Sequence, residues 1–329
     1  MKPPSTTWQE TIEPGEDDRF ETFGKQLVAM QKRKSEKYGT GRALHRKQVT
    51  GLSASLEIFG DLPEHARHGL FAKPATYDAR IRLSNGSMEK QADSRGDIRG
   101  FGIKVLGVSG KNALDGGECK SQEFALIQRA AFGFARVEPF VGLVLAAAQG
   151  PIALVKHLVH EHGLIGALKL MKQLAVAQNA KFTGFASEPF FSAAPIACGP
   201  YAVRVRIAPE TSPLSSARAL DWASDMRAQL GRGPVRFAFQ LQFFVDEQTT
   251  PIEDATNAWP EAEAPFVTVG RLTLPPQSIG EGQADQLTAA VESTTFDPWN
   301  ALAAHRPLGN IMRARKVAYF HSEQARNAK

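Results

Sequence analysis

A few side chains in this sequence could take part in metal or acid–base chemistry, and singly they are ordinary. His157 and His160 lie three residues apart in a stretch of helical character, where they could share a metal ion. Only Glu161 stands beside them as a further ligand, so no metal centre is predicted there. His45 has basic neighbours, and Tyr319 stands near the end of the chain. Taken alone, each would be a surface or packing residue.

The order of four short segments along the chain supports a functional role for His45 and Tyr319. Arg42 precedes His45 by three residues, and Arg315 precedes Tyr319 by four. Between the two pairs stand the segments IRLSN and then DIRGFGIK. This order resembles the haem-binding core of the haem catalases and of their shorter catalase-related relatives. The resemblance extends over most of the chain, from Arg42 to Tyr319.

The resemblance implies a role for each residue on the distal side of a haem. His45 would be the base above the iron, and Ser84 would hydrogen-bond its other ring nitrogen. Arg42 and Arg82 would pair with the haem propionates. A neutral histidine suits this chemistry, because it can take the first proton of a bound peroxide and deliver it to the leaving oxygen.

On the proximal side, the resemblance implies that Tyr319 ligates the iron as a phenolate. Arg315 lies one helical turn earlier on the same face, where its charge would lower a phenol pKa that is normally near 10. The segment FGFARVEPF is similar to the distal FFxRDxxxF pattern of the family if Arg136 is taken as its arginine. Phe134 then matches the second phenylalanine, and Phe140 falls one place short of the last, so both are expected to contact the haem.

Two positions depart from the family pattern. The distal asparagine of catalases is replaced by Gln128, which keeps the amide on a longer side chain. Gly133 replaces the first of the paired phenylalanines, which would widen the pocket or its entrance. These departures predict slow disproportionation of hydrogen peroxide and a better fit for a larger organic hydroperoxide.

The elements that position these residues follow from hydrophobic periodicity. Apolar residues recur every three or four positions from Asp17 to Tyr38, which predicts a helix that ends at Gly39. Alternation and turn pairs predict strands at 53–59, 77–83, 101–105, 124–127, 203–207, 237–243 and 267–274. Further helices are predicted as two or three within 138–178, one at 213–230 and one from residue 311 onward.

Strands at this short spacing indicate an antiparallel sheet or barrel. We predict one α+β domain over residues 17–329, after a flexible N-terminal arm of residues 1–16. The resemblance implies an eight-stranded antiparallel β-barrel of the catalase type with a helical insert and a C-terminal helix. The apolar insert at 138–178 is expected to pack against the barrel; an alternative is that it helps an enzyme meet lipid.

Composition excludes several classes of protein. Hydrophobic residues make up 43% of the 329 and charged residues 22%, which excludes a disordered chain and a coiled coil. The net charge of +5 comes from interspersed signs, so no nucleic-acid partner is expected. Cys119 and Cys198 cannot form a disulfide framework, and no apolar stretch is long enough for a signal or a membrane span. A cytoplasmic protein without an integral membrane segment is predicted.

The sequence thus predicts a haem-dependent peroxidase of the catalase-related type, with haem b as its cofactor. It would cleave hydrogen peroxide or organic hydroperoxides and oxidise a small organic or lipid co-substrate. One alternative is rearrangement or cleavage of lipid hydroperoxides without a reductant, as in the related allene oxide synthase domain. Another is haem storage or sensing without catalysis. A homodimer is one expected assembly.

Overall fold

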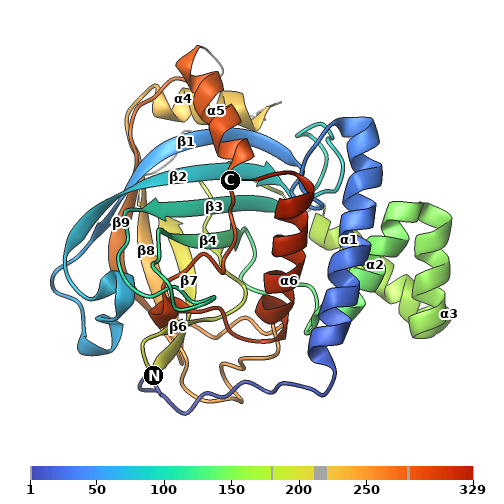
Figure 1. Ribbon diagram of the computed structural model, residues 1–329, viewed down its shortest axis with the longest axis horizontal. Helices are drawn as coiled ribbons and strands as arrows, with labels where there is room; N and C mark the ends of the chain where they lie inside the picture. The colour runs from blue at the N-terminus through green and yellow to red at the C-terminus, as the bar shows by residue number, and fades with distance from the viewer. Residues whose placement is uncertain (1, 179–180, 211–220, 280–281, 329) are drawn as a thin grey trace.

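The computed structural model describes residues 2–178, 181–210, 221–279 and 282–328, whose elements are shown in Figure 1. Within these ranges, nine antiparallel strands form one sheet in the order β5-β4-β3-β2-β1-β9-β8-β7-β6. Because β5 pairs with both β4 and β7, eight strands close into a barrel, and β6 adds to the edge of β7. The predicted eight-stranded antiparallel barrel is confirmed.

Seven of the strands are long enough to show clear alternation. They are Lys47–Ile58 (β1), Ala75–Asn85 (β2), Arg99–Leu106 (β3), Ser121–Ile127 (β4), Tyr201–Pro209 (β7), Val235–Phe243 (β8) and Phe266–Leu274 (β9). The other two, Phe190–Phe191 (β5) and Ile196–Cys198 (β6), are very short. The sequence pattern predicts the seven long strands and misses the two short ones.

The barrel interior is filled by apolar side chains. On β2, Ile81 and Leu83 point inward and are fully buried. The rings of Phe190 and Phe237 lie 5.1 and 5.5 Å from the ring of Phe101, between centroids. Such a packed interior leaves the chemistry to the outer face, where every second residue of a strand points.

Helices cover one side of the barrel, as Figure 1 shows. Glu16–Tyr38 (α1), Val137–Gln149 (α2) and Asn310–Ala325 (α6) share a second apolar cluster that includes Phe20, Val141 and Ile311. The predicted N-terminal and C-terminal helices are therefore present. The short α5 (Gln283–Ser293) packs on β1, and α4 (Trp222–Leu230) lies near the same end of the barrel. Of the helix predicted at 213–230, residues 213–220 lie outside the described residues.

Three single turns of 3₁₀-helix complete the elements. They are Glu64–Ala66 (η1), Gly69–Phe71 (η2) and Ala303–His305 (η3). Buried His305 links two of them, because its Nε2 accepts a hydrogen bond of 2.8 Å from the backbone N–H of Leu70. η3 packs on η2 and on the short strand β6.

The helical insert differs from its predicted packing. Pro151–Gln178 (α3) packs mainly on α2, and it bends at Gly163, whose φ of 65° and ψ of 174° are not helical. No helix of the described residues combines the length and the hydropathy required to cross a bilayer.

The N-terminal segment has no helix or strand before Glu16, and it lies along the barrel. The backbone N–H of Ser5 donates to the carbonyl of Phe244 at 2.8 Å. Trp8 Nε1 donates to the carbonyl of Pro200 at 2.8 Å. Glu10 accepts from the backbone N–H of Gly309, just before α6, also at 2.8 Å. These bonds connect the segment to both the barrel and the C-terminal helix.

Candidate functional site

His45 lies in the turn just before β1, in a backbone conformation that few side chains adopt. Its φ is 49°, in the left-handed region, which costs a residue with a Cβ about 1–2 kcal/mol. Two hydrogen bonds hold it there: its N–H donates to the carbonyl of Gly86 at 2.9 Å, and its carbonyl accepts from Arg82 at 2.8 Å. The ring is thereby directed over the outer face of β2 and β3.

Ser84 is the side chain that orients this ring. His45 Nδ1 lies 3.0 Å from Ser84 Oγ, and Ser84 is buried on β2. Gly100 lies opposite Ser84 on β3. A Cβ at residue 100 would lie 2.5 Å from His45 Nδ1 and 2.6 Å from Ser84 Oγ, so the pair requires glycine at this position. Both partners and the glycine come from segments singled out in the sequence.

The charge state of His45 is set by its surroundings. Burial, and then the positive charges of Arg82, Arg315 and Arg42, together lower the pKa of its imidazole to about 3. The ring is therefore neutral at physiological pH. Since Nδ1 is engaged by Ser84, Nε2 is the nitrogen that can exchange a proton with a bound molecule.

Three arginines from different elements meet beside this histidine. Arg42 and Arg82 form ion pairs of 2.8 and 2.9 Å with Glu292, at the end of α5. Arg326, just after α6, donates to the backbone carbonyls of Glu292 and Thr294 at 3.1 and 3.0 Å. Arg42 also donates hydrogen bonds to both of these carbonyls. Arg326 was not predicted as a site residue.

This arginine cluster (Arg42, Arg82 and Arg326) carries more positive charge than its acidic partners balance. The Glu292 carboxylate pairs with Arg42 and Arg82, whereas Arg326 donates to the backbone carbonyl of Glu292. Glu323 is a second acid whose charge acts on Arg326 and Arg42, so two acidic groups face three guanidinium groups. The pKa of Arg82 is lowered to about 9, by burial and then by Arg42, and that of Arg326 to about 10 for the same reasons. The buried Nε of Arg326 also has no hydrogen-bond partner among the described residues. The arrangement suits a bound anion, above all one with carboxylate groups.

Tyr319 lies on α6, and Arg315 precedes it by one turn. Burial raises the pKa of the Tyr319 phenol above its ordinary value of 10, against the opposing charges of Arg315 and Arg42. Arg315 and Arg42 also act on His45, so the phenol and the imidazole lie within one charged region. The phenol is neutral by itself, and it needs a cation at its oxygen to become a phenolate.

Two carboxyl groups, those of buried Asp297 and half-buried Glu323, act on the same tyrosine. Burial raises the pKa of Asp297 well above the ordinary range, and the charges of Glu323 and Glu123 add to the effect. The pKa of Glu323, on α6, is raised to about 7, first by burial and then by Glu123. Glu123 is compensated by Lys104 at 2.9 Å. Within the described residues no group of three histidine, cysteine or acidic side chains could hold a bare metal ion.

Gln128 lies just beyond β4, and its amide is occupied by backbone groups. Its Oε1 accepts from the N–H of Arg99, and its Nε2 donates to the carbonyl of Asp97 at 3.2 Å. These bonds fasten the start of β3, so the amide does not point freely at a bound molecule. Gly133 is exposed, and a Cβ there would meet nothing within 4 Å.

Phe134 and Phe140 lie together at the start of α2. Their ring centroids are 5.7 Å apart, and Phe132 lies 5.0 Å from Phe140 and 6.2 Å from Phe134. Phe132 and Phe140 pack on the cluster shared by α1, α2 and α6. Arg136, between them, pairs instead with Glu13 at 2.9 Å.

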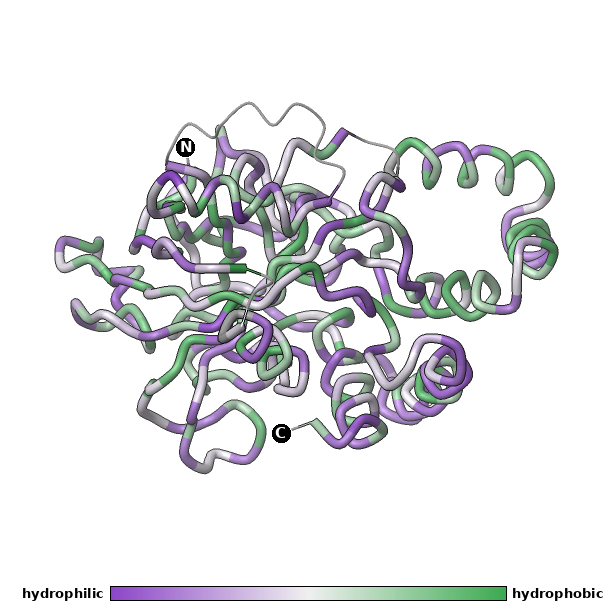
Figure 2. The backbone as a smooth tube through the Cα atoms, turned by 90° about the horizontal axis from the view of Figure 1, so that it is seen from above, coloured by the Kyte–Doolittle hydropathy of each residue, from purple (hydrophilic) through white to green (hydrophobic). Residues whose placement is uncertain are grey.

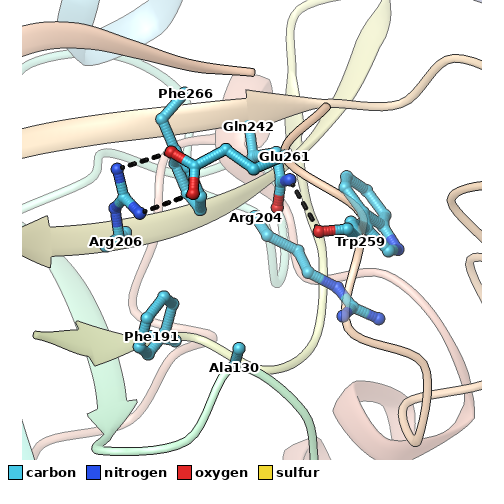
Figure 3. A pocket seen from close by; sticks show the side chains of 8 residues that line it. All are labelled: Ala130, Phe191, Arg204, Arg206, Gln242, Trp259, Glu261 and Phe266. Carbon is cyan, nitrogen blue, oxygen red and sulfur yellow. Dashed lines mark hydrogen bonds and ion pairs between the residues drawn. The ribbon is translucent and has the colours of Figure 1, made fainter. Parts of the chain in front are cut away.

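A cavity of about 160 Å³ lies on the outer face of β7 and β8, with Ala130 and Phe191 in its wall (Figure 3). Figure 3 shows Glu261 pairing with Arg206 and the amide of Gln242 bonded to the carbonyl of Trp259. Arg204 also lines the cavity. Its walls include none of the site residues predicted from the sequence, as far as the described residues show.

Comparison with known proteins identifies the fold. The sequence matches no protein-family model and no curated protein. Among solved structures, a fungal catalase shares 16% identity with a TM-score of 0.66, covering 88% of this chain and 59% of its own. Catalase A from Saccharomyces cerevisiae shares 15% identity with a TM-score of 0.67, and the match covers 87% of this chain and 61% of that catalase. A bacterial catalase shares 15% identity with a TM-score of 0.65, and the match covers 88% of this chain and 57% of that catalase. The fold is therefore catalase-like, and the chain spans about three fifths of the length of these catalases.

Proposed function

We propose that this chain of catalase-like fold binds haem b on the outer face of its barrel and acts as a peroxidase. The observation that carries the proposal is the meeting of three groups at one place. These are the His45–Ser84 pair, the arginine cluster and the Arg315–Tyr319 pair. Hydrogen peroxide or an organic hydroperoxide would be the oxidant, and a small organic or lipid molecule the reductant.

The residues present fit a haem. The excess positive charge of the arginine cluster and the unpaired Nε of Arg326 suit the two propionates. Tyr319 would ligate the iron through its phenolic oxygen. Bound haem would supply the redox-active iron at which the O–O bond of a peroxide is cleaved.

His45 would move the proton that this cleavage requires. Because its pKa is about 3, the ring is neutral at neutral pH. In the tautomer in which Nδ1–H donates to Ser84 Oγ, Nε2 carries the lone pair that can accept the proton of a peroxide O–H group. The same nitrogen then returns the proton to the departing oxygen. Ser84 holds Nδ1, and the backbone bonds of His45 fix the ring, so that proton transfer needs no rearrangement.

Tyr319 has to release its phenolic proton before it can act as an anionic ligand. Burial opposes this step, whereas Arg315 and Arg42 favour it. The positive charge of the iron would complete the stabilisation of the phenolate. Asp297 and Glu323, which raise the same pKa, would limit the negative charge tolerated there.

An absorption spectrum tests the proposal. Protein expressed with ample haem is expected to show a Soret band, and Tyr319→Phe should shift this band or weaken haem binding. Tyr38→Phe, at the end of α1, is the matched control and should leave the spectrum unchanged. Absence of a Soret band in the wild type would refute haem binding, and an unchanged spectrum of Tyr319→Phe would refute the ligand.

A second candidate function is rearrangement or cleavage of lipid hydroperoxides without a reductant. The backbone-bonded amide of Gln128 and the open space at Gly133 favour it over disproportionation of hydrogen peroxide. Product analysis with a fatty-acid hydroperoxide distinguishes the two functions. One molecule of reductant oxidised per hydroperoxide supports the peroxidase, and isomerised or cleaved lipid without reductant consumption supports the alternative.

A further inference from the structure

Exposed apolar side chains gather on α3. Of the ten large hydrophobic side chains that the described residues expose, seven belong to this helix. Ile165 is 84% exposed and Ile152 72%, and the others are Val155, Leu164, Leu168, Met171 and Val176. Scattered exposed apolar residues are common on proteins, but such a concentration on one element marks an interaction surface.

The position of α3 makes this surface accessible. Figure 1 shows α3 at the edge of the molecule, beyond α1 and α2. Figure 2 shows α2 and the two halves of α3 standing out from the barrel, with green and purple stretches along them. We call residues 137–178 the helical projection. The bend at Gly163 turns the second half of α3 away from the direction of the first.

Positive charge accompanies the apolar residues. Along α3, Lys156, Lys169 and Lys172 are exposed, against Glu161 as its one acidic residue. Lys172 follows Leu168 by four residues, and Lys169 follows Ile165 by four, so apolar and basic side chains share one face. Lysine stems can lie along an apolar surface while their ammonium groups reach toward anionic headgroups.

We propose that the helical projection docks this protein on the surface of membranes that contain anionic lipids. Apolar residues of α3 would enter the boundary between headgroups and acyl chains, and the three lysines would pair with lipid phosphates and carboxylates. A second copy of the chain fits less well. A two-fold contact through the same face would bring the lysines of both copies together. The proposal does not depend on haem binding.

Sedimentation with lipid vesicles tests the proposal. We expect the wild-type protein to sediment with vesicles of phosphatidylcholine and phosphatidylserine, more weakly with phosphatidylcholine alone, and less as salt is added. Ile165→Glu combined with Leu168→Glu should reduce binding at least tenfold, because it places two charges in the apolar face. Lys169→Gln combined with Lys172→Gln should also lose roughly tenfold on the anionic vesicles.

The control is Ile12→Glu, because Ile12 is 67% exposed, as is Leu164, but lies outside α3. This variant should bind vesicles like the wild type, and all variants should keep the wild-type circular dichroism. The proposal is overturned if the wild type binds no vesicles, or if the α3 variants bind as well as the control. It is equally overturned if the wild type is a dimer that the α3 substitutions dissociate.

Discussion

The imidazole of His45 lies among three guanidinium groups, and its proton equilibrium is linked to folding. An unfolded chain protonates this residue near pH 6.5, whereas the folded protein does so only near pH 3. Between these values the unfolded state binds the additional proton. The free energy of unfolding therefore falls as the pH drops from 6.5 toward 3, and above pH 6.5 this contribution is constant.

Replacement of His45 by asparagine should remove this pH dependence. Asparagine tolerates positive φ, so the backbone of the turn is retained. In urea denaturation of the haem-free protein, the wild type should lose up to about 1.4 kcal/mol per pH unit more than His45→Asn between pH 6 and 4. His160→Asn, at an exposed position on α3, should keep the wild-type slope. Parallel curves for His45→Asn and the wild type would contradict the burial of a neutral ring.

At Gly100, the absence of a Cβ leaves room for the hydrogen bond between His45 and Ser84. A Cβ in Gly100→Ala would overlap both His45 Nδ1 and Ser84 Oγ, and the imidazole would have to move. We expect a loss of stability of about 1–3 kcal/mol. We also expect a peroxide reaction slower by roughly tenfold to a hundredfold in haem-loaded protein, measured by stopped flow. Gly133→Ala, which meets nothing within 4 Å, should change neither quantity. Equal rates in the two variants would argue against a catalytic role for the His45 ring position.

Part of this residue-scale arrangement is predictable from the sequence. Arg42, His45 and Ser84 could be selected because each stands at a recognisable spacing in a short segment, and the structure brings them together. Arg326 was missed, although it follows Tyr319 by seven residues, which is about two helical turns and hence the same face. The backbone bonds of Gln128 could not be foreseen, because they depend on how β3 and β4 pair.

At the scale of elements, α5 and the last turn of α6 meet through Glu292. Its carboxylate and backbone carbonyl connect α5 to β2, to the turn before β1 and to the residue after α6. Glu292→Gln removes the charge that compensates the arginine cluster. Since the side chain of Glu292 is 34% exposed, solvent screens the effect, and we expect a destabilisation of about 1–2 kcal/mol in haem-free protein.

The same substitution should cost less stability once haem is bound, because propionates would supply negative charge to the arginines. Thermal or urea unfolding of both forms measures the difference. Glu57→Gln, which breaks only a 3.8 Å surface pair with Arg271, should change stability by less than about 0.5 kcal/mol in either form. An equal loss in both forms of Glu292→Gln would argue against propionates at this cluster.

The elements themselves differ in how far the sequence predicts them. α1 was predicted within one residue at its start, because its apolar residues keep helical spacing and Gly39 ends it with a φ of 76°. β5 and β6 were not predicted, because strands of two or three residues are too short to show an alternation of apolar and polar residues. The packing of α3 was predicted wrongly, because leucine, isoleucine and valine occur around its whole circumference and do not indicate which face meets water.

At the scale of the whole molecule, two cores hold the structure together. The barrel interior is the larger, and the cluster between α1, α2 and α6 is the smaller. The candidate site lies between them, on the outer face of β2 and β3 and against α6. Such a site depends on contacts far apart in sequence, which explains why the order of motifs indicated it and local patterns did not.

Closure of the barrel depends on very few hydrogen-bonded residues. β4 meets β5 through the single pair Ile127 and Phe191, whereas β1 and β2 pair along their whole length. This seam, the pairing of β4 with β5, should therefore open locally more often than the rest of the barrel. In hydrogen–deuterium exchange, the amides of Phe190 and Phe191 should exchange at least roughly tenfold faster than those of Ile81 and Leu83. Equal protection would contradict this expectation.

An opening between β4 and β5 would also affect the residues beside this pair of strands. Phe191 also lines the cavity beside Arg204 and Arg206, and Gln128 directly follows Ile127. An opening between β4 and β5 would loosen the cavity wall and the anchor of Gln128 in the same event. We therefore expect that a molecule bound in this cavity would also reduce the motion of Gln128.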